Sequence, residues 1–206
     1  IKIPNFCRVD IQKSVLRRQK NSLRCNRPKL IYVGRIVPIK NLRLVLEVLS
    51  KTELECDFDI WGPVADMRYW ADCQRVIGLI PKNVTVKYFG GAPRDLVSSL
   101  LSNSDLLVHP SFSENFGHVI HESLLVGTPV LVGPCTPLKA SQVGVTISEL
   151  RSADWARAMD ELLVNFDRAQ QEKEREFIRN HTMRRFRRNN ELVKGEFIKL
   201  FGVDIR

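Results

Sequence analysis

The chain has 206 residues, which is enough for one substantial domain with a hydrophobic core, and its apolar and charged fractions are ordinary for a globular protein. No apolar run approaches the roughly 20 residues of a membrane-spanning helix, so we expect no segment to cross a bilayer. The formal net charge is +9, and residues 1–40 hold eleven Lys and Arg against one acid. Such basic ends suit phosphate-rich partners or an anionic membrane, and they equally suit simple solvated faces.

Cysteine usage indicates the compartment. The five cysteines are odd in number and show no CxxC spacing, which argues against both a disulfide framework and a zinc site. We therefore expect a reducing, cytoplasmic setting. The first residue is Ile1 and nothing near it resembles a signal peptide, so we interpret the chain as a fragment of a longer protein.

In chain order, the first 28 residues are basic and broken by prolines, and we expect them to be a linker. From Leu30 onward, short apolar runs alternate with segments of helical period. The expected strands are 30–34, 57–61, 84–89, 105–110, 129–133 and 145–147. The expected helices are 41–50, 67–79, 95–103, 118–127 and 153–164, followed by helical segments at 168–180 and 183–201.

This alternation predicts an α/β domain, a doubly wound Rossmann-like parallel sheet of about six strands with helices on both faces. We assign residues 29–165 to this domain and residues 166–206 to basic C-terminal helices. Ligands of such sheets bind beyond the carboxyl ends of the strands. At those ends the chain has Gly34-Arg35, Gly62-Pro63, Gly90-Gly91 and the loop 110–117.

The loop VGRIVPIKN (33–41) joins the first strand to a helix and contains two cations. Arg35 and Lys40 could neutralise two phosphates beside a helix N-terminus, where free N–H groups favour anions. The loop matches neither GxxxxGKS nor GxGxxG. Taken alone, it is equally consistent with exposed cations.

The stretch ENFGHVIHE (114–122) has a glutamate at each end and a glycine where the next helix is expected to begin. His118, His121 and Glu122 have the i, i+3, i+4 spacing of one helix face, but they lack the HExxH order of zinc proteases, so we expect no protein-bound metal. A glycosidase pair of Glu114 and Glu122 is disfavoured, because those carboxylates flank a deep cleft. We expect both to accept hydrogen bonds from sugar or ribose hydroxyls.

These motifs together resemble the C-terminal, donor-binding half of family 4 glycosyltransferases, which have the GT-B fold. The resemblance covers residues 30–150 and is carried by VGRIVPIK (33–40), DFDIWGP (57–63), VTVKYFGGAP (84–93) and SDLLVHPSFSENFGHVIHESLLVGTPVLV (104–132), while IPN (3–5) resembles the segment that leaves the N-terminal domain. The family commonly has Lys-Gly where this chain has Lys40-Asn41.

The resemblance implies roles for individual residues. Arg35 and Lys40 correspond to the pair that binds the donor diphosphate, Glu114 to the glutamate on the transferred sugar, and Glu122 to the one on the ribose. Arg35, Lys40 and Glu114 are the implied catalytic group, with no cofactor and no protein-bound metal. The full implied donor site is Gly34, Arg35, Lys40, Gly62, Gly90, Ala92, Glu114, Asn115, Phe116, Gly117, His118, Val119 and Glu122.

The resemblance thus implies the donor half of a retaining, metal-independent bacterial hexosyltransferase of polysaccharide biosynthesis. The donor would be a nucleoside diphosphate sugar, with UDP-sugar the first choice, and the acceptor a saccharide or a lipid-linked molecule. The resemblance also implies that the acceptor-binding N-terminal domain is absent from this chain, so we expect the chain alone to bind donor with little or no transfer. One alternative is a nucleotide-sugar epimerase of related GT-B fold.

The other alternative is a basic nucleic-acid-binding module, suggested by RNHTMRRFRRNN (179–190), although no nucleic-acid motif occurs and we expect no nucleic-acid partner. We expect this basic tail to pack against the missing domain, to rest on an anionic membrane at the cytoplasmic face, or to pack on its own sheet. Its apolar stripe is Phe186, Leu192, Val193, Phe197, Ile198 and Leu200.

Overall fold

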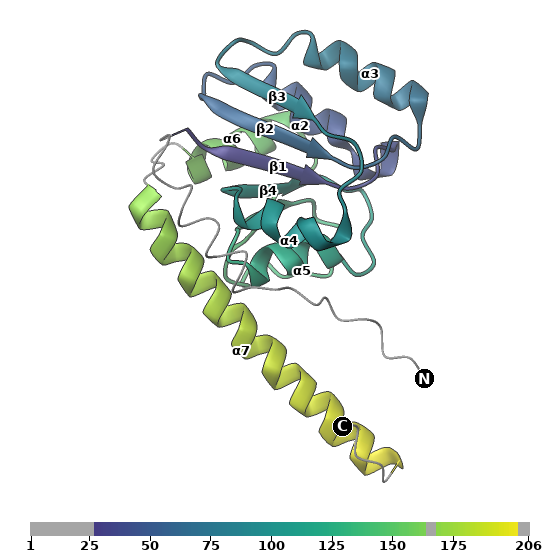
Figure 1. Ribbon diagram of the computed structural model, residues 1–206, viewed down its shortest axis with the longest axis vertical. Helices are drawn as coiled ribbons and strands as arrows, with labels where there is room; N and C mark the ends of the chain where they lie inside the picture. The colour runs from purple at the N-terminus through teal and green to yellow at the C-terminus, as the bar shows by residue number, and fades with distance from the viewer. Residues whose placement is uncertain (1–26, 164–167, 202–206) are drawn as a thin grey trace.

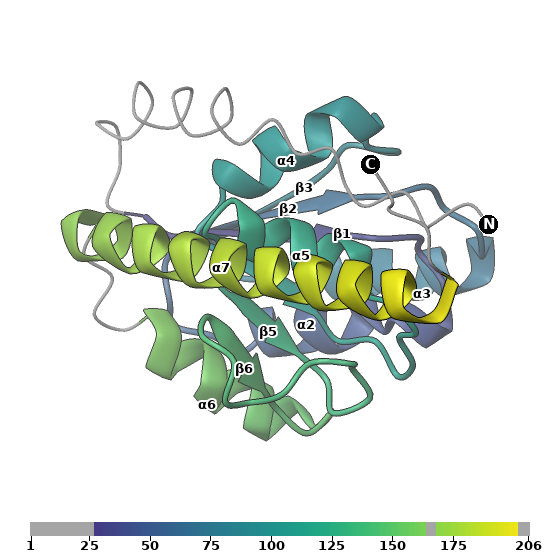
Figure 2. The ribbon, with the colours of Figure 1, turned by 90° about the horizontal axis from the view of Figure 1, so that it is seen from below.

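The computed structural model describes residues 27–163 and 168–201. Its described part contains one six-stranded sheet, fully parallel, in the order β3-β2-β1-β4-β5-β6 (Figure 1 for β1 to β4, Figure 2 for β5 and β6). The strands are β1 Lys29–Val33, β2 Cys56–Trp61, β3 Val84–Tyr88, β4 Leu106–His109, β5 Val130–Val132 and β6 Val145–Ile147. The Rossmann-like parallel sheet expected from the sequence is confirmed.

The strand order creates a crevice between β1 and β4. The chain moves outward from β1 to β3, returns to β4 beside β1, and then moves outward the other way to β6. Leu30 of β1 lies opposite Phe58 of β2 on one side and Leu106 of β4 on the other. Because the crossovers leave β1 and β4 in opposite directions, this is the position where open parallel sheets bind ligands.

Helices cover both faces of the sheet. α2 (Leu42–Leu49), α3 (Met67–Ile77) and α6 (Ser152–Leu163) contribute to one hydrophobic cluster, and α4 (Arg94–Ser102), α5 (His118–Leu125) and α7 (Arg168–Phe201) to the other. Figure 1 shows α4, α5 and α7 together on one side of the strands. Apart from α7, the expected helices agree with these bounds to within a few residues; α3, for example, ends just before Gly78.

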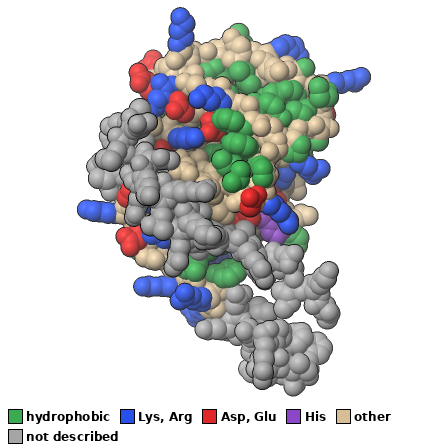
Figure 3. All heavy atoms as spheres, in the orientation of Figure 1, with side chains coloured by type: hydrophobic (Ala, Val, Ile, Leu, Met, Phe, Trp, Pro, Cys, Tyr) green, Lys and Arg blue, Asp and Glu red, His purple; other side chains and the backbone are tan. Residues whose placement is uncertain are grey.

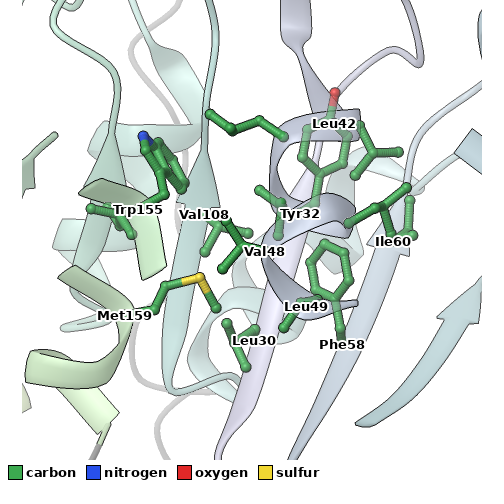
Figure 4. Packing of buried hydrophobic residues seen from close by; sticks show 14 of the residues in the cluster. Leu30, Tyr32, Leu42, Val48, Leu49, Phe58, Ile60, Val108, Trp155 and Met159 are labelled. Carbon is green, nitrogen blue, oxygen red and sulfur yellow. The ribbon is translucent and has the colours of Figure 1, made fainter. Parts of the chain in front are cut away.

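The cluster under α2 and α6 shows how strand alternation builds the two faces. Leu30 and Tyr32 of β1 point into it, beside Leu49 of α2 and Trp155 and Met159 of α6 (Figure 4). The intervening Ile31 belongs to the cluster on the opposite face. This period of two fixes the face of every side chain along a strand, including the last one.

The C-terminal helix α7 is one continuous helix of 34 residues, whereas the sequence suggested two segments. At about 1.5 Å per residue it is roughly 50 Å long, and Figures 1 and 2 show it running past α5 and beyond the sheet. No proline interrupts it. Buried Arg175 anchors its first half, donating to the carbonyls of Ser102 and Ser104 and to Thr128 Oγ1 at 2.6–2.8 Å.

Several expectations fall outside the described residues. The linker assigned to residues 1–28 is described only at its last two positions, and the boundary at 165/166 lies in the undescribed segment 164–167. In the apolar stripe only the Phe186 side chain is described; those of Leu192, Val193, Phe197, Ile198 and Leu200 are not. Within the described ranges, no helix is long and apolar enough to span a membrane.

Candidate functional site

The loop after β1 presents Lys40 toward the crevice. Pro38–Lys40 form the short 3-10 helix η1, and Asn41 then adopts the left-handed conformation with φ 52° and ψ 35° before α2 begins. A side chain is strained in this region, and asparagine tolerates it best among residues with a Cβ. Asparagine can therefore occupy a position at which the family that the sequence resembles commonly has glycine.

The loop after β4 presents Glu114, which is the centre of the site. Glu114 Oε2 lies 2.5 Å from Lys40 Nζ and 2.8 Å from His109 Nε2, and Oε1 accepts a hydrogen bond from the Gly117 backbone N–H at 3.2 Å. Lys40 and Glu114 are 74 residues apart in sequence, and both are mostly buried at the side chain. The switch point between β1 and β4 therefore holds an ion pair with a defined geometry.

Hydrogen bonds to the Ile39 carbonyl fasten the two loops to each other. The Ile39 carbonyl accepts from the Phe112 N–H at 2.9 Å and from the Ser111 hydroxyl at 3.2 Å, and that hydroxyl also lies 2.7 Å from the Ser113 carbonyl. Ser111 is buried. The Lys40–Glu114 pair is thus held by two connected loops as well as by its own contact.

The N-terminus of α5 contacts this pair through the hydrogen bond from Gly117 N–H to Glu114. Gly117 precedes the helix with φ 59°, and a Cβ there would lie 2.9 Å from a side-chain carbon of Ile120. The first N–H groups of a helix have no acceptor within the helix, so those of His118 and Val119 can bind an anion or a hydroxyl oxygen. The expectation that the helix begins at Gly117 is confirmed.

The hydrogen bonds to Glu114 determine its charge. Donation from His109 and from Lys40 lowers the pKa of Glu114 from 4.5 to about 2, although partial burial acts in the opposite direction. The carboxylate is consequently ionised at neutral pH. It can accept hydrogen bonds and stabilise nearby positive charge, but it is a poor proton donor or general base.

The loops after β1, β2 and β3 are joined in a row along the same edge. Gly34 N–H donates to the Trp61 carbonyl at 2.9 Å, and Gly62 N–H donates to the Gly90 carbonyl at 2.6 Å. A Cβ on Gly62 would lie 1.8 Å from the Gly34 carbonyl oxygen, so only glycine allows this approach. The structure therefore brings the predicted residues Gly34, Gly62 and Gly90 together, while Ala92 lies further along the last loop.

Aromatic side chains surround the outer part of this edge. Trp61 and Phe89 stack with ring centroids 4.5 Å apart and planes 7° apart, and the Tyr88 hydroxyl donates to the Gly62 carbonyl. Phe89 and Tyr88 are exposed. Figure 3 shows hydrophobic side chains gathered on the side toward which the strands of Figure 1 point, with Lys and Arg around them. Flat exposed rings of this kind suit the stacking of a nucleobase.

The other predicted residues belong to the loops after β1 and β4 and to α5. Within the described residues, Arg35 is exposed and its guanidinium makes no hydrogen bond or ion pair. Asn115 and Phe116 are exposed, and the Phe116 ring lies 5.8 Å from that of His118. Glu122 is half-buried in α5, one turn after His118 on the same helix face.

The described residues contain no group of three His, Cys, Asp or Glu side chains that could hold a metal ion. Three of the five cysteines, Cys56, Cys73 and Cys135, are described and are free thiols, while Cys7 and Cys25 lie outside the described ranges. His121 is exposed and its Nδ1 lies 3.1 Å from the Gly117 carbonyl, at the surface of α5.

Sequence reasoning missed two contacts of the candidate site, those of His109 and Ser111. In the run DLLVHPS they stand only as a strand end and a loop residue. The alternation along β4 was a usable signal for His109, because Leu107 lies in the cluster under α5 and the side chain two residues later points to the same face. Nothing in the local pattern indicated that Ser111 would join the two loops.

The family model described as "Glycosyl transferases group 1" matches residues 16–182. The chain belongs to this glycosyltransferase family. Among curated glycosyltransferases, it is 27% identical over 145 residues to the alpha-D-kanosaminyltransferase of Streptomyces kanamyceticus, covering 67% of this chain and 37% of that protein. It is 28% identical over 155 residues to the D-inositol 3-phosphate glycosyltransferase of Mycobacteroides abscessus, covering 71% and 34%. The chain therefore spans about a third of the length of these relatives.

Solved structures of glycosyltransferases have the same fold as this domain. A glycosyltransferase from Rickettsia africae superposes with a TM-score of 0.71 at 18% identity, covering 93% of this chain and 53% of that one. HepE from Anabaena, solved in complex with UDP and glucose, superposes with a TM-score of 0.63 at 22% identity, covering 84% and 46%. The chain thus fits the C-terminal half of a GT-B glycosyltransferase.

Proposed function

We propose that this glycosyltransferase domain binds a nucleoside diphosphate sugar in the crevice between β1 and β4 and supports retaining transfer of a hexose. The observation that carries the proposal is the Lys40–Glu114 pair at 2.5 Å beneath the N-terminus of α5. A cation, a carboxylate and free helix N–H groups together match the diphosphate and the sugar hydroxyls of such a donor.

In this proposal Lys40, Arg35 and the α5 amides receive the charge that develops on the leaving diphosphate. Charge stabilisation of this kind accelerates a reaction because it is stronger in the transition state than in the ground state. We propose that these groups suffice without a protein-bound metal. The low pKa of Glu114 supports a role in accepting a hydrogen bond from a sugar hydroxyl, and not a role in an acid/base pair. We assign Glu122 to the ribose.

The nucleotide is proposed from two observations. The exposed aromatic residues Tyr88 and Phe89 at the β3 end offer a place for the base, next to Gly90. HepE, which shares the fold, was solved with UDP and with UDP-glucose. UDP-sugar is accordingly the first choice of donor.

Transfer to an acceptor is proposed to need more than this chain. Its curated relatives are about three times as long as the segment that matches, and the described site offers a donor crevice. We therefore expect the isolated chain to bind donor with little or no transfer to a saccharide or lipid-linked acceptor. Efficient transfer by the isolated chain would contradict this part of the proposal.

The test is a calorimetric titration of the chain with UDP, GDP and ADP. We expect one nucleotide to bind best, and Glu122→Ala to weaken all of them by about 1–3 kcal/mol through loss of a charged acceptor for the ribose. Lys40→Met should weaken the diphosphates while leaving the free nucleoside unaffected.

Glu161→Ala is the matched control, because Glu161 is an exposed helical glutamate in α6, on the opposite face of the sheet from α5. It should leave every affinity unchanged. Absence of binding by all three nucleotides to the unmodified chain would refute the proposed function.

A further inference from the structure

His109 is a buried histidine beside the proposed sugar site, and the proposed function gives it no role. It is the last residue of β4, pairs in register with Val132 of β5, and is 3% exposed. Its Nε2 lies 2.8 Å from Glu114 Oε2. Because Glu114 is ionised and can only accept, the proton of this hydrogen bond is on Nε2.

Packing alone does not explain an imidazole at this position. Among the described residues, Nδ1 of His109 is buried without a hydrogen-bond partner. A buried polar atom without a partner costs free energy, and an aliphatic side chain would fill the same place without that cost. The contact that distinguishes histidine from leucine here is the one to Glu114.

The contacts of Glu114 leave one acceptor position for a substrate. An ionised carboxylate accepts about four hydrogen bonds. Oε2 is shared by Lys40 and His109, and Oε1 receives one bond, from Gly117 N–H. The remaining capacity is on Oε1, the oxygen next to the first turn of α5.

We propose that His109 is a positioning residue for the transferred sugar: it holds Glu114 so that Oε1 accepts a hydroxyl of that sugar while Lys40 binds the diphosphate. This inference rests on the proposed function. A diphosphate would draw on the same ammonium group and loosen its contact with Glu114, so a second donor that stays on the carboxylate keeps it in position when donor is bound. The sugar hydroxyl donates to Oε1, and no covalent bond to His109 forms.

The structure makes His109 the more rigid of the two supports. β4 is hydrogen-bonded to a neighbouring strand on each side, to β1 and to β5, and the imidazole has two rotatable bonds. Lys40, in contrast, has a long flexible side chain at the end of a three-residue turn. Groups held on strands keep catalytic geometry better than groups held on loops.

The charged and titratable groups around Glu114 determine which residue can be substituted in a test. They are Lys40 on η1, His109 on β4 and the hydroxyl of Tyr32 on β1, whose pKa is raised mainly by burial. The N-terminus of α5 adds the Gly117 N–H. Only His109 can be changed here without removing the proposed diphosphate ligand or the central β1 core.

The test uses the 206-residue chain, the nucleotide that binds best in the calorimetric titration, and the glucose conjugate of that nucleotide. We expect His109→Leu to leave the affinity for the nucleotide within about twofold and to lower the conjugate-to-nucleotide affinity ratio about tenfold, the scale of one hydrogen bond to a charged group. His109→Gln places an amide N–H near Nε2 and should restore most of the ratio.

Two further readouts separate positioning from a structural role. NMR titration of the Glu114 side-chain carboxyl should show its pKa rising from about 2 toward the ordinary range in His109→Leu and falling again in His109→Gln. In a Glu114→Gln background, His109→Leu should change the affinity ratio no further, because the effect passes through the carboxylate.

The possible failures are distinguishable. If the unmodified chain binds no nucleotide, both the proposed function and this inference are refuted. If it binds nucleotide but the ratio is unchanged in His109→Leu, only the inference is overturned. The inference is also overturned if the ratio falls equally in the Glu114→Gln background.

Discussion

Replacing Glu114 by glutamine tests the ion pair through its dependence on pH. Glutamine has nearly the same shape, but it cannot ionise and cannot accept from both Lys40 and His109 at one charged oxygen. The pKa of Glu114 lies near 2 in the folded chain and at 4.5 when unperturbed, so the folded state favours the ionised form. At 1.36 kcal/mol per unit, and with some reduction for partial exposure, ionisation stabilises the fold by about 2–3 kcal/mol.

The sign follows from the lowered pKa. The stabilisation is complete above about pH 5, where the unfolded chain is also ionised, and it is lost as pH falls toward 2. The free energy of unfolding of the unmodified chain should therefore exceed that of Glu114→Gln by about 2–3 kcal/mol at pH 7, and by less than about half of this at pH 3. Urea unfolding followed by circular dichroism at pH 7, 5, 4 and 3 measures the difference.

A difference that stays constant from pH 7 to pH 3 would refute the reasoning, because it would show that the amide disturbs the loop by shape and not by charge. A matched control is Glu149→Gln, which changes an exposed glutamate outside the site. That variant should follow the unmodified chain at every pH.

Three further predictions concern the scaffold and are read by urea unfolding. Gly62→Ala should destabilise the fold by about 2 kcal/mol or more, because its Cβ would overlap a backbone oxygen at 1.8 Å, whereas Gly91→Ala, which meets nothing within 4 Å, should be close to neutral. Asn41→Ala should cost about 1 kcal/mol for its left-handed conformation, and Asn41→Gly should cost less. Arg175→Met should cost about 2–4 kcal/mol by removing three buried hydrogen bonds from a charged donor, while exposed Arg184→Met should cost little; equal effects would contradict the anchoring of α7.

Much of the fold was predictable because local pattern and layer architecture agree. The strands β1, β4 and β5 are short apolar runs, the helices α2 to α6 each have an apolar face, and the breakers fall at the carboxyl edge. Those features place Lys40 and Glu114 at one edge of the sheet before any coordinates are known. The same features do not predict that the two side chains contact each other. The pairing depends on β1 lying beside β4, which is one of several possible strand orders for the same alternation.

The missed contacts have a different origin. In the sequence His109 is a polar residue at the end of a strand. Its contact with Glu114 depends on the loop after β4, which brings the carboxylate within 2.8 Å of the imidazole. Ser111 is similar, since its partner Ile39 is 72 residues away. Likewise, the continuity of α7 reflects the absence of proline over a long stretch, which is weak evidence in sequence and becomes clear only with Arg175 docked.

The geometry of the free chain also constrains how donor would enter the proposed site. Lys40 and Glu114 neutralise each other at 2.5 Å, so a diphosphate must compete with Glu114 for the ammonium group. That competition weakens binding of an anion that offers charge alone. A nucleotide sugar compensates in part, because its sugar hydroxyl can occupy the open position on Oε1 while His109 and the Gly117 N–H keep the carboxylate in place. The pair thereby favours ligands that have both a phosphate and a hydroxyl in the crevice, which is the chemistry that distinguishes a sugar donor from a free phosphate.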